Sequence, residues 1–442
     1  MTQLNATHDP ARRSWVESAN RPDCDFPIQN LPLGIFSTSG ERRAGVAIGD
    51  KVVDLQAALA AGLFEGDAAE AVRVTQTGRL NELMGAERRL ASALRAALSE
   101  LLSSGSPDSL RALAVADQIL LEQGQVQMEV PCDIGDYTDF LTSRHHTERH
   151  GRFKGLQDPL PPVFTSLPVA YHGRASSIRI SGTDVVRPNG QYRRTDGQIG
   201  FGPAPMLDFE LEMAAFVARG NRLSEPIPID AARDHIFGYC LLNDWSAKSI
   251  QWWEQMLGPF LGKSFLTSVS PWVVTEEALL PFRLPATARQ ADDPPLLAYL
   301  NGVKDQAEGG IDIALEAWIS TAAQRDAGQP AVRITRTHLS NLYWTFGQML
   351  THHASNGCNL RPGDLIGSGT ISGEQDESRA CLTELTNAGK DPLPVGNGEF
   401  RTALDDGDEI ILKARASHEG AVTIGFGEVR GRIRPARVWP EF

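Results

Sequence analysis

The stretch LDFELEMAAFV (residues 207–217) places three acidic side chains at alternate positions inside an otherwise apolar segment. In a β-strand, successive side chains point to opposite faces, so Asp208, Glu210 and Glu212 share one face and the apolar residues share the other. One interpretation is a strand whose polar face meets water. The other is a cation site, because neighbouring like charges repel and a divalent ion between them removes that cost.

From about residue 130 onward, the sequence consists of short apolar runs separated by Gly and Pro, such as SIRISGTDVVRP, DLIGSGTISG and AVTIGFGEV. This pattern predicts many short strands and few long helices. Strands and helices do not alternate regularly, which argues against a doubly wound parallel sheet. We therefore expect an α+β fold that is rich in strands.

The first part of the chain has a different pattern. GIFS and RAGVAIGDKVVDL predict short strands, and helical runs follow at residues 55–61, 87–102 and 110–123. A turn-rich break, SSGSPDS (residues 103–109), precedes the last run. We predict two domains, at residues 1–130 and 131–442.

The composition limits the class of protein and its partners. A chain of 442 residues with 41% hydrophobic and 22% charged residues is expected to fold. A net charge of −13 argues against nucleic acid or an anionic membrane as partner and favours a cation. No signal-peptide core, membrane-span length of apolar residues or CxxC spacing is present, so we expect a cytoplasmic protein without a disulfide framework or zinc ribbon.

A second polar segment, DYTDFLTSRHHTERHG (residues 136–151), places Asp136 and Asp139 just ahead of His145, His146 and His150. A zinc site would need His146 and His150 on one helical face, but no Cys partner or HExxH spacing accompanies them. A general base is the simpler role, because histidine titrates near neutrality. A surface helix with mixed charges explains the segment equally well.

Two later segments carry further candidates. Asp244, Lys248 and Gln251 recur at helical spacing, which predicts one face of a helix, with Asp244 as a helix cap in the alternative interpretation. In NGCNLRPGDLIGSGTISG (residues 356–373), the glycine-rich backbone and Thr370 are suited to contact an anionic ligand. A tight β-turn explains the same glycines.

Taken together and in order, these motifs resemble the fumarylacetoacetase family. The resemblance runs nearly from end to end, through DFPIQNLPLGIFS, GVAIGDKVVDL, IGDYTDF, LPVAYHGRASS, RLSEPIPI, HIFGYCLLNDWSAKSIQ, LGPFLGKSF, SPWVV, THHASNGCNLRPGDL and SGTISG. The joint order is more specific than any single motif. It implies a small SH3-like β domain at the N-terminus, a larger mixed β-sandwich or roll that carries catalysis, and a homodimer.

The resemblance also implies two metal positions. Calcium would be held by four carboxylates, those of Asp139, Glu210, Glu212 and Asp244. Magnesium would lie at Asp244, Lys263 and Thr267, in part through backbone oxygen because an ammonium group cannot ligate a cation. Asp208 and Asp136 match no ligand of the family, so the strand argument counts one acid too many.

The implied reaction is hydrolysis of a carbon–carbon bond in 4-fumarylacetoacetate, a 1,3-diketone, to give fumarate and acetoacetate. Water activated by His146, which Glu384 orients, attacks a carbonyl group whose oxygen the calcium polarises. The resemblance assigns stabilisation of the enolate to Lys248, Gln251 and Lys263. It assigns contacts with the substrate to Lys154, Tyr171, Gln251 and Thr370.

Four positions depart from the family pattern. Leu141 replaces a tyrosine, Lys154 and Lys248 replace arginines, and Gln255 stands where a substrate tyrosine is expected. Lysine lacks the bidentate fork that suits a carboxylate. These changes leave the metal and base positions intact, but they affect the positions that would decide which substrate binds. The alternatives are therefore an acylpyruvase or β-keto acid decarboxylase of the same superfamily and, from another class, a non-catalytic cation-binding protein.

Overall fold

The acidic stretch at residues 207–217 lies in the middle of a large sheet. In the computed structural model, which describes residues 3–440, it forms β12 (Leu207–Asp208) and β13 (Leu211–Val217). Every residue of both strands is buried, so the interpretation as a strand with a solvated face is wrong. A single continuous strand is also wrong, because β12 pairs with β15 (Ser246–Ala247) and β13 pairs with other strands.

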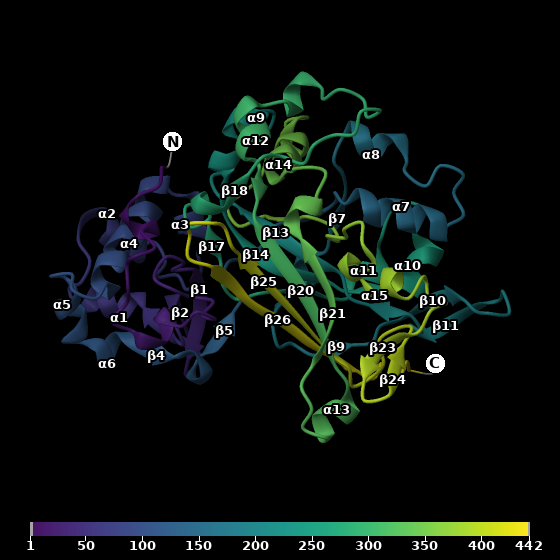
Figure 1. The fold of residues 1–442 in the computed structure, drawn as a ribbon, viewed down its shortest axis with the longest axis horizontal. Coiled ribbons are helices and arrows are strands. Elements are labelled where there is room, and N and C mark those ends of the chain that lie inside the picture. Colours follow the sequence, from purple (N-terminus) through teal and green to yellow (C-terminus); the bar gives the residue numbers. More distant parts are fainter. Residues whose placement is uncertain (1–2, 441–442) are drawn as a thin grey trace.

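This sheet has eight strands in the order β7-β6-β22-β13-β14-β16-β8, with β17 paired to β14. Figure 1 labels β13 and β14 near the middle of the molecule. β13 is antiparallel to both of its neighbours, and β6 runs parallel to β22. The bounds are β6 (Tyr137–Leu141), β7 (Val169–Gly173), β8 (Ile178–Ile180), β14 (Ile236–Asp244), β16 (Thr267–Val269), β17 (Val274–Thr275) and β22 (Leu365–Gly367).

Alternation along β13 divides the interior of the protein into two hydrophobic cores. Leu211 and Met213 enter the core on one face of the sheet, and Ala214 and Phe216 enter the core on the other. Since packed side chains bury both faces of β13, apolar residues occur on both sides of the strand. Glu212 therefore shares its face with Ala214 and Phe216.

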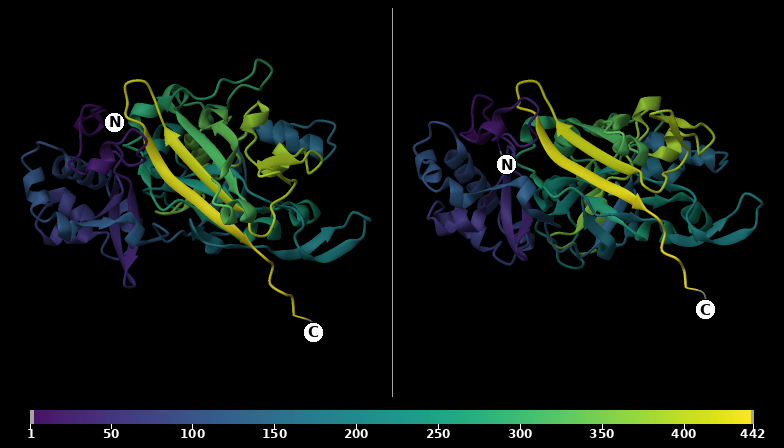
Figure 2. Two further views of the ribbon diagram at one scale, coloured as in Figure 1. Left: turned by 60° about the horizontal axis from the view of Figure 1, so that its bottom comes forward. Right: turned by 90° about the horizontal axis from the view of Figure 1, so that it is seen from below.

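The first core lies between this sheet and a five-stranded sheet of order β21-β20-β25-β26-β9. Figure 2 shows the long strands β25 and β26 crossing the molecule side by side. The bounds are β9 (Val185–Val186), β20 (Ile313–Ser320), β21 (Val332–His338), β25 (Glu409–Ala416) and β26 (Ile424–Arg434). Two packed sheets with few long helices confirm the predicted strand-rich α+β fold.

The second core joins the large sheet to the N-terminal part of the chain. A five-stranded sheet of order β4-β3-β2-β1-β5 carries helices beside it (Figure 1). Its strands are β1 (Leu33–Thr38), β2 (Glu41–Ile48), β3 (Lys51–Asp54), β4 (Leu120–Glu122) and β5 (Gln127–Glu129). The helices are α1 (Leu55–Ala60), α2 (Gly66–Arg73), α3 (Asn81–Gly85), α4 (Arg88–Leu102), α5 (Ser109–Leu113) and α6 (Ala116–Ile119).

The helices predicted at residues 55–61 and 87–102 are confirmed by α1 and α4, but the single helix predicted at 110–123 is wrong. Two short helices, α5 and α6, replace it, and the backbone at Val115 leaves the helical region (φ −126°, ψ 17°). Leu120 then pairs with Val53 as part of β4. The sheet edge supplies partners for this backbone, which overrides the local helical preference.

The remaining elements surround the large sheet. The helices are α7 (Arg144–Phe153), α8 (Pro162–Ser166), α9 (Ile229–Ala232), α10 (Lys248–Glu254), α11 (Leu261–Ser264), α12 (Val303–Glu308), α13 (Ala322–Asp326), α14 (Phe346–Ala354) and α15 (Leu382–Leu385). Small two-stranded pairs are β10 (Asn189–Arg193) with β11 (Ile199–Pro203), β18 (Arg283–Leu284) with β19 (Gly310–Ile311), and β23 (Leu393–Gly396) with β24 (Glu399–Arg401). Within residues 3–440, no helix has the length and apolarity that crossing a membrane requires.

Candidate active site

Three acids converge on one face of the eight-stranded sheet. Asp139 comes from β6, Glu212 from β13 and Asp244 from the end of β14. Because side chains alternate along a strand, the three acids lie on the same face of the sheet as Ala214 and Phe216. The N-terminal part of the chain covers another region of this face. One carboxylate oxygen from each of the three lies within 4.8 Å of the others. The fold thus brings together residues that are spread over more than a hundred positions of the sequence.

These acids fit a hard divalent cation. Both carboxylate oxygens of Glu212 are buried, and neither accepts a hydrogen bond from any residue between 3 and 440. Burial, followed by the charges of Asp139 and Asp244, raises the pKa of Glu212 well above its ordinary value. Buried oxygens without partners are costly, and an oxygen-seeking cation would satisfy them.

Glu210 has a different environment from these three acids. Its carboxylate accepts hydrogen bonds from Lys263 Nζ (2.6 Å), Thr370 Oγ1 (2.9 Å) and Ser246 Oγ (2.8 Å), and it forms an ion pair with Lys248. Burial alone would raise the pKa of Glu210, but the two ammonium groups hold it well below its ordinary value. Glu210 is therefore ionised, and each of its carboxylate oxygens accepts from one lysine and one hydroxyl group.

Asp244 joins the three acids to Lys263. Its carboxylate accepts hydrogen bonds from Tyr171 Oη (2.8 Å), from Thr267 Oγ1 (3.2 Å) and from the Lys263 ammonium group. Burial would lower the pKa of Lys263, but Asp244 and Glu210 raise it, so the lysine stays charged. A cavity of about 160 Å³ opens here, and Tyr171, Asp244, Lys263 and Thr267 line part of it.

The prediction that Asp244, Lys248 and Gln251 share one helical face is wrong, and so is the alternative of Asp244 as a helix cap. Asp244 ends β14, and α10 begins at Lys248 after a short strand, with no side-chain cap. The pairing of Asp244 with Thr267 across β14 and β16 fixes it in the sheet. Lys248 and Gln251 do lie on α10, and Gln251 Oε1 is buried without a hydrogen-bond partner in the described chain.

His146 and Glu384 form the expected pair. His146 lies on α7 and its Nδ1 is 2.9 Å from Glu384 Oε2 on α15. Arg149 donates to the other carboxylate oxygen at 3.2 Å. Burial would raise the pKa of Glu384, but the charge of His146 and its hydrogen bond hold it far below its ordinary value. When the imidazole is neutral, the ionised carboxylate favours the tautomer with the proton on Nδ1, which leaves Nε2 as the acceptor. The interpretation of α7 as a solvated surface helix is wrong at His146, which is buried.

Asp208 has a supporting role that the sequence did not indicate. Its two carboxylate oxygens accept hydrogen bonds from the backbone amides of Leu382 (2.7 Å) and Thr383 (2.8 Å), at the start of α15. These contacts fix the helix that carries Glu384. Asp136 lies away from the acids, where it forms an ion pair with Arg361.

The fumarylacetoacetase N-terminal family matches residues 29–131, and the fumarylacetoacetate (FAA) hydrolase C-terminal family matches residues 137–434. The chain belongs to the fumarylacetoacetase family. It is 45% identical to the fumarylacetoacetase of Oryza sativa subsp. japonica, with 96% of this chain and 97% of that protein covered. For the fumarylacetoacetase of Homo sapiens, identity is 44% and coverage is 94% and 97%. Among solved structures, a fumarylacetoacetate hydrolase from psychrophilic Exiguobacterium antarcticum has a similar fold, with a TM-score of 0.51, 18% identity, and 92% of this chain and 100% of that chain covered.

Two of the positions that depart from the family pattern contact each other. Lys154 Nζ, at the end of α7, donates to Gln255 Oε1, just after α10, at 3.3 Å. Burial and the charge of Lys248 lower the pKa of Lys154. The third position, Leu141, ends β6 and packs against the first core. Lys154 and Gln255 therefore contact each other at the ends of two helices.

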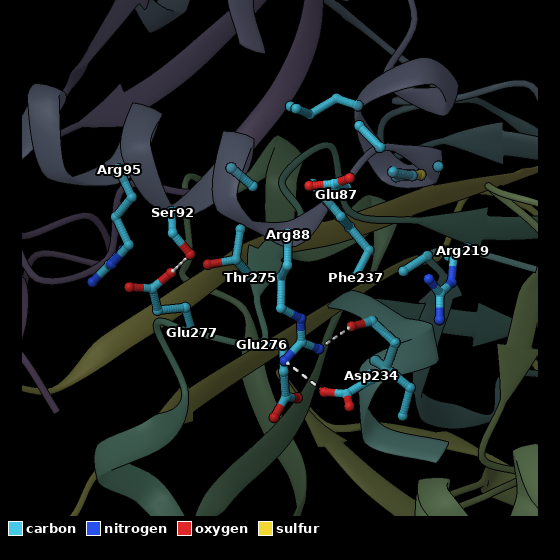
Figure 3. A pocket seen from close by; sticks show the side chains of 17 residues that line it. Glu87, Arg88, Ser92, Arg95, Arg219, Asp234, Phe237, Thr275, Glu276 and Glu277 are labelled. Carbon is cyan, nitrogen blue, oxygen red and sulfur yellow. Dashed lines mark hydrogen bonds and ion pairs between the residues drawn. The ribbon is translucent and has the colours of Figure 1, made fainter. Parts of the chain in front are cut away.

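A larger cavity, of about 320 Å³, lies elsewhere, between α4 and the large sheet (Figure 3). Several of its charged and polar groups have partners: Ser92 donates to Glu277 at 2.6 Å, and Arg88 lies 3.4 Å from Asp234. None of the three convergent acids lines it. The smaller cavity, by contrast, is lined by Asp244, one of the three convergent acids, together with Lys263 and Tyr171.

Proposed function

We propose that this protein hydrolyses the carbon–carbon bond of 4-fumarylacetoacetate to give fumarate and acetoacetate, as in tyrosine and phenylalanine breakdown. The observation that carries the proposal is 45% identity, over 96% of the chain, to a protein named fumarylacetoacetase. The geometry supports it, since an acid cluster that fits a cation and a histidine–glutamate pair lie on neighbouring elements.

We assign the cation site to Asp139, Glu210, Glu212 and Asp244, and we propose calcium as its ion. Magnesium would lie beside it, at Asp244, Thr267 and the backbone of Lys263. All of these groups are buried, and three of the acids have oxygens within 4.8 Å of one another. A bound divalent cation would supply Lewis-acid polarisation of a substrate carbonyl oxygen.

His146 acts as the general base. Its Nε2 accepts a proton from water while the water oxygen attacks a carbonyl carbon of the diketone. Glu384 stabilises the imidazolium that results, and Arg149 holds the carboxylate of Glu384 in place. The carbon–carbon bond then breaks, its electron pair passes to the acetoacetate carbon as an enolate, and a proton completes the product.

Lys263, Lys248 and Gln251 stabilise the negative charge of the enolate. Both ammonium groups are buried, so their effect on a developing charge is stronger than it would be in water. Tyr171 and Thr370 contact the substrate from β7 and from the segment after β22. Lys154, beside Gln255, binds a substrate carboxylate as a single charge rather than as a bidentate fork.

We also propose that the protein is a cytoplasmic homodimer. Sedimentation equilibrium of the purified protein tests the assembly, with a monomer as the contradicting result.

The decisive experiment is an assay of the purified protein with 4-fumarylacetoacetate, with and without a chelator, beside acylpyruvates. We expect release of fumarate and acetoacetate, loss of activity with the chelator and recovery when calcium is added back. Preference for an acylpyruvate would move the protein to another activity of its superfamily. Absence of product from every substrate would contradict a hydrolase.

A further inference from the structure

A second group of metal-ligating side chains lies beside the proposed base. His146 and His150 are one turn apart on α7, and their ring centroids are 4.2 Å apart. Cys381 and Glu384, at the start of α15, face the same point. One possible ligand atom from each of these four residues lies within 4.8 Å of all the others.

The proposed hydrolysis leaves half of this group unexplained. It uses His146 and Glu384, but it gives no role to His150 or Cys381. The Nε2 atom of His150 is buried, and it has no hydrogen-bond partner within residues 3–440. Cys381 is fully buried, and its Sγ donates to Glu384 Oε2 at 3.3 Å. A buried polar atom without a partner indicates a missing ligand or ion.

The donor atoms select a different ion from the one at the acid cluster. Two imidazole nitrogens, a thiol sulfur and a carboxylate oxygen form a set that is typical of zinc, whereas calcium and magnesium prefer oxygen alone. Two histidines at i and i+4 on a helix can share one zinc ion. The sequence offered no cysteine near them, and the fold supplies Cys381 from a segment more than two hundred positions away.

We propose that His146, His150, Cys381 and Glu384 form a zinc site that inhibits the enzyme when it is occupied. Zinc–ligand bonds of about 2.0–2.3 Å place tetrahedral ligands roughly 3.5 Å apart, so the side chains need to move inward by only about 1 Å. The Cys381 proton leaves to solvent as the thiolate binds the ion. Both histidines bind as neutral imidazoles, each through one lone pair.

Inhibition follows from the lone pair of His146, and this part of the inference rests on the proposed function. A neutral imidazole has one nitrogen that can accept a proton. When zinc occupies that lone pair, His146 cannot take a proton from water. Zinc at this site therefore blocks the base directly, without displacing a cation from the acid cluster.

The site itself is tested without any measurement of activity. Cobalt(II) added to the full-length protein, with the acid cluster saturated by calcium, should bind and give a thiolate-to-cobalt charge-transfer absorption. Cys381→Ser keeps a donor to Glu384 and should lose this band, whereas the control Cys358→Ser should keep it, because Cys358 lies outside the group. A band that persists in Cys381→Ser, or cobalt binding with no sulfur band, would overturn the proposal.

Zinc inhibition of fumarylacetoacetate hydrolysis tests the consequence. Removal of a ligand should weaken inhibition by more than the roughly 10-fold to 100-fold that loss of a second-shell partner costs. His150→Phe keeps an aromatic ring against His146, and His150→Val is a smaller alternative if the first variant unfolds. Equal zinc sensitivity of the wild type and both variants would overturn the inference. If the wild type has no hydrolase activity, the proposed function fails, and the cobalt spectrum still decides the site.

Discussion

Glu212 is the residue that most directly links the fold to a cation. A fully buried carboxylate with no hydrogen-bond donor, beside two other acids, is unfavourable in the metal-free protein. Glu212→Gln should therefore raise the metal-free free energy of unfolding by on the order of 1 kcal/mol and abolish the stabilisation by calcium. Thermal unfolding with chelator and with calcium checks both effects, with the exposed Glu70→Gln on α2 as control. An unchanged calcium response in Glu212→Gln would contradict the assignment.

Glu384 should act on catalysis without acting on the cation. Glu384→Gln removes the charge that stabilises the imidazolium of His146 and is expected to lower kcat by at least about 100-fold. Its calcium-dependent thermal stabilisation should equal that of the wild type, because Glu384 lies outside the acid cluster. Asp376→Asn, an exposed acid near α15, is the matched control. Loss of calcium stabilisation in Glu384→Gln would show that the two roles are not separate.

At the residue scale, the sequence pointed to several side chains that the fold brings close together, but not to the contacts among them. Strand alternation and the family resemblance together indicated Glu212, Asp244 and His146. They did not indicate that Glu210 is paired with two lysines, or that Asp208 holds the backbone of α15 from 174 positions away. Such contacts depend on which loops the fold brings together, and no local pattern encodes that.

Elements were predicted well where periodicity extended over many residues and poorly where neighbouring strands decided the outcome. The long helix α4 matches its predicted range within one residue. The strand at residues 207–217 divides because β12 pairs with β15, and the helix expected at residues 110–123 ends because Leu120 joins a sheet. In both cases, pairing with a distant segment overrides local preference.

The short helix α15 provides an element-scale prediction. Asp208→Ala removes the acceptor for two backbone amides at its start and should lower the free energy of unfolding by about 0.5–2 kcal/mol. Because α15 carries Glu384, kcat should fall while KM changes little. Asp208→Asn retains one acceptor and should recover most of the activity. Steady-state kinetics of the two variants separates these outcomes, and unchanged kcat in Asp208→Ala would contradict the positioning role.

The contact between α12 and the start of α14 should depend on pH. Burial raises the pKa of Asp305 to about 6, although Thr345 donates to it at 2.9 Å. Between the ordinary carboxyl value and about 6, the folded chain binds a proton that the unfolded chain releases, so the free energy of unfolding falls as pH rises. Asp305→Asn should not lose stability in this way, because an amide does not titrate in this pH range. The free energy of unfolding of Asp305→Asn, relative to that of the wild type, should therefore increase by on the order of 1–3 kcal/mol between pH ~4 and pH ~7.

Urea unfolding of the wild type and of Asp305→Asn at several pH values measures this difference. The comparison cancels the titration of other groups, which both proteins share. A difference between the two proteins that stays constant over this pH range would mean that Asp305 titrates alike in the folded and unfolded chains.

At the scale of the whole molecule, the eight-stranded sheet is shared by both parts of the protein. One face packs on the five-stranded sheet β21-β20-β25-β26-β9, and the other face contributes Ala214, Phe216 and Leu242 to the core of the N-terminal part. The acids project from this second face, beyond the region that the N-terminal part covers. Because both faces are packed, the strands that carry the three acids are held in place on both sides, which the proposed cation site on three strands would require.

This shared core predicts that the two parts unfold together. Phe216 is fully buried between them, and Phe216→Ala should lower the free energy of unfolding by about 3–5 kcal/mol, whereas Phe400→Ala, on an exposed hairpin, should change it little. Hydrogen exchange followed by mass spectrometry should show β2 and β14 losing protection at the same denaturant concentration in both the wild type and Phe216→Ala. Loss of protection in β2 well before β14 would mean that the N-terminal part is held by its own core alone, and that its contact with the sheet contributes little to the stability of the site.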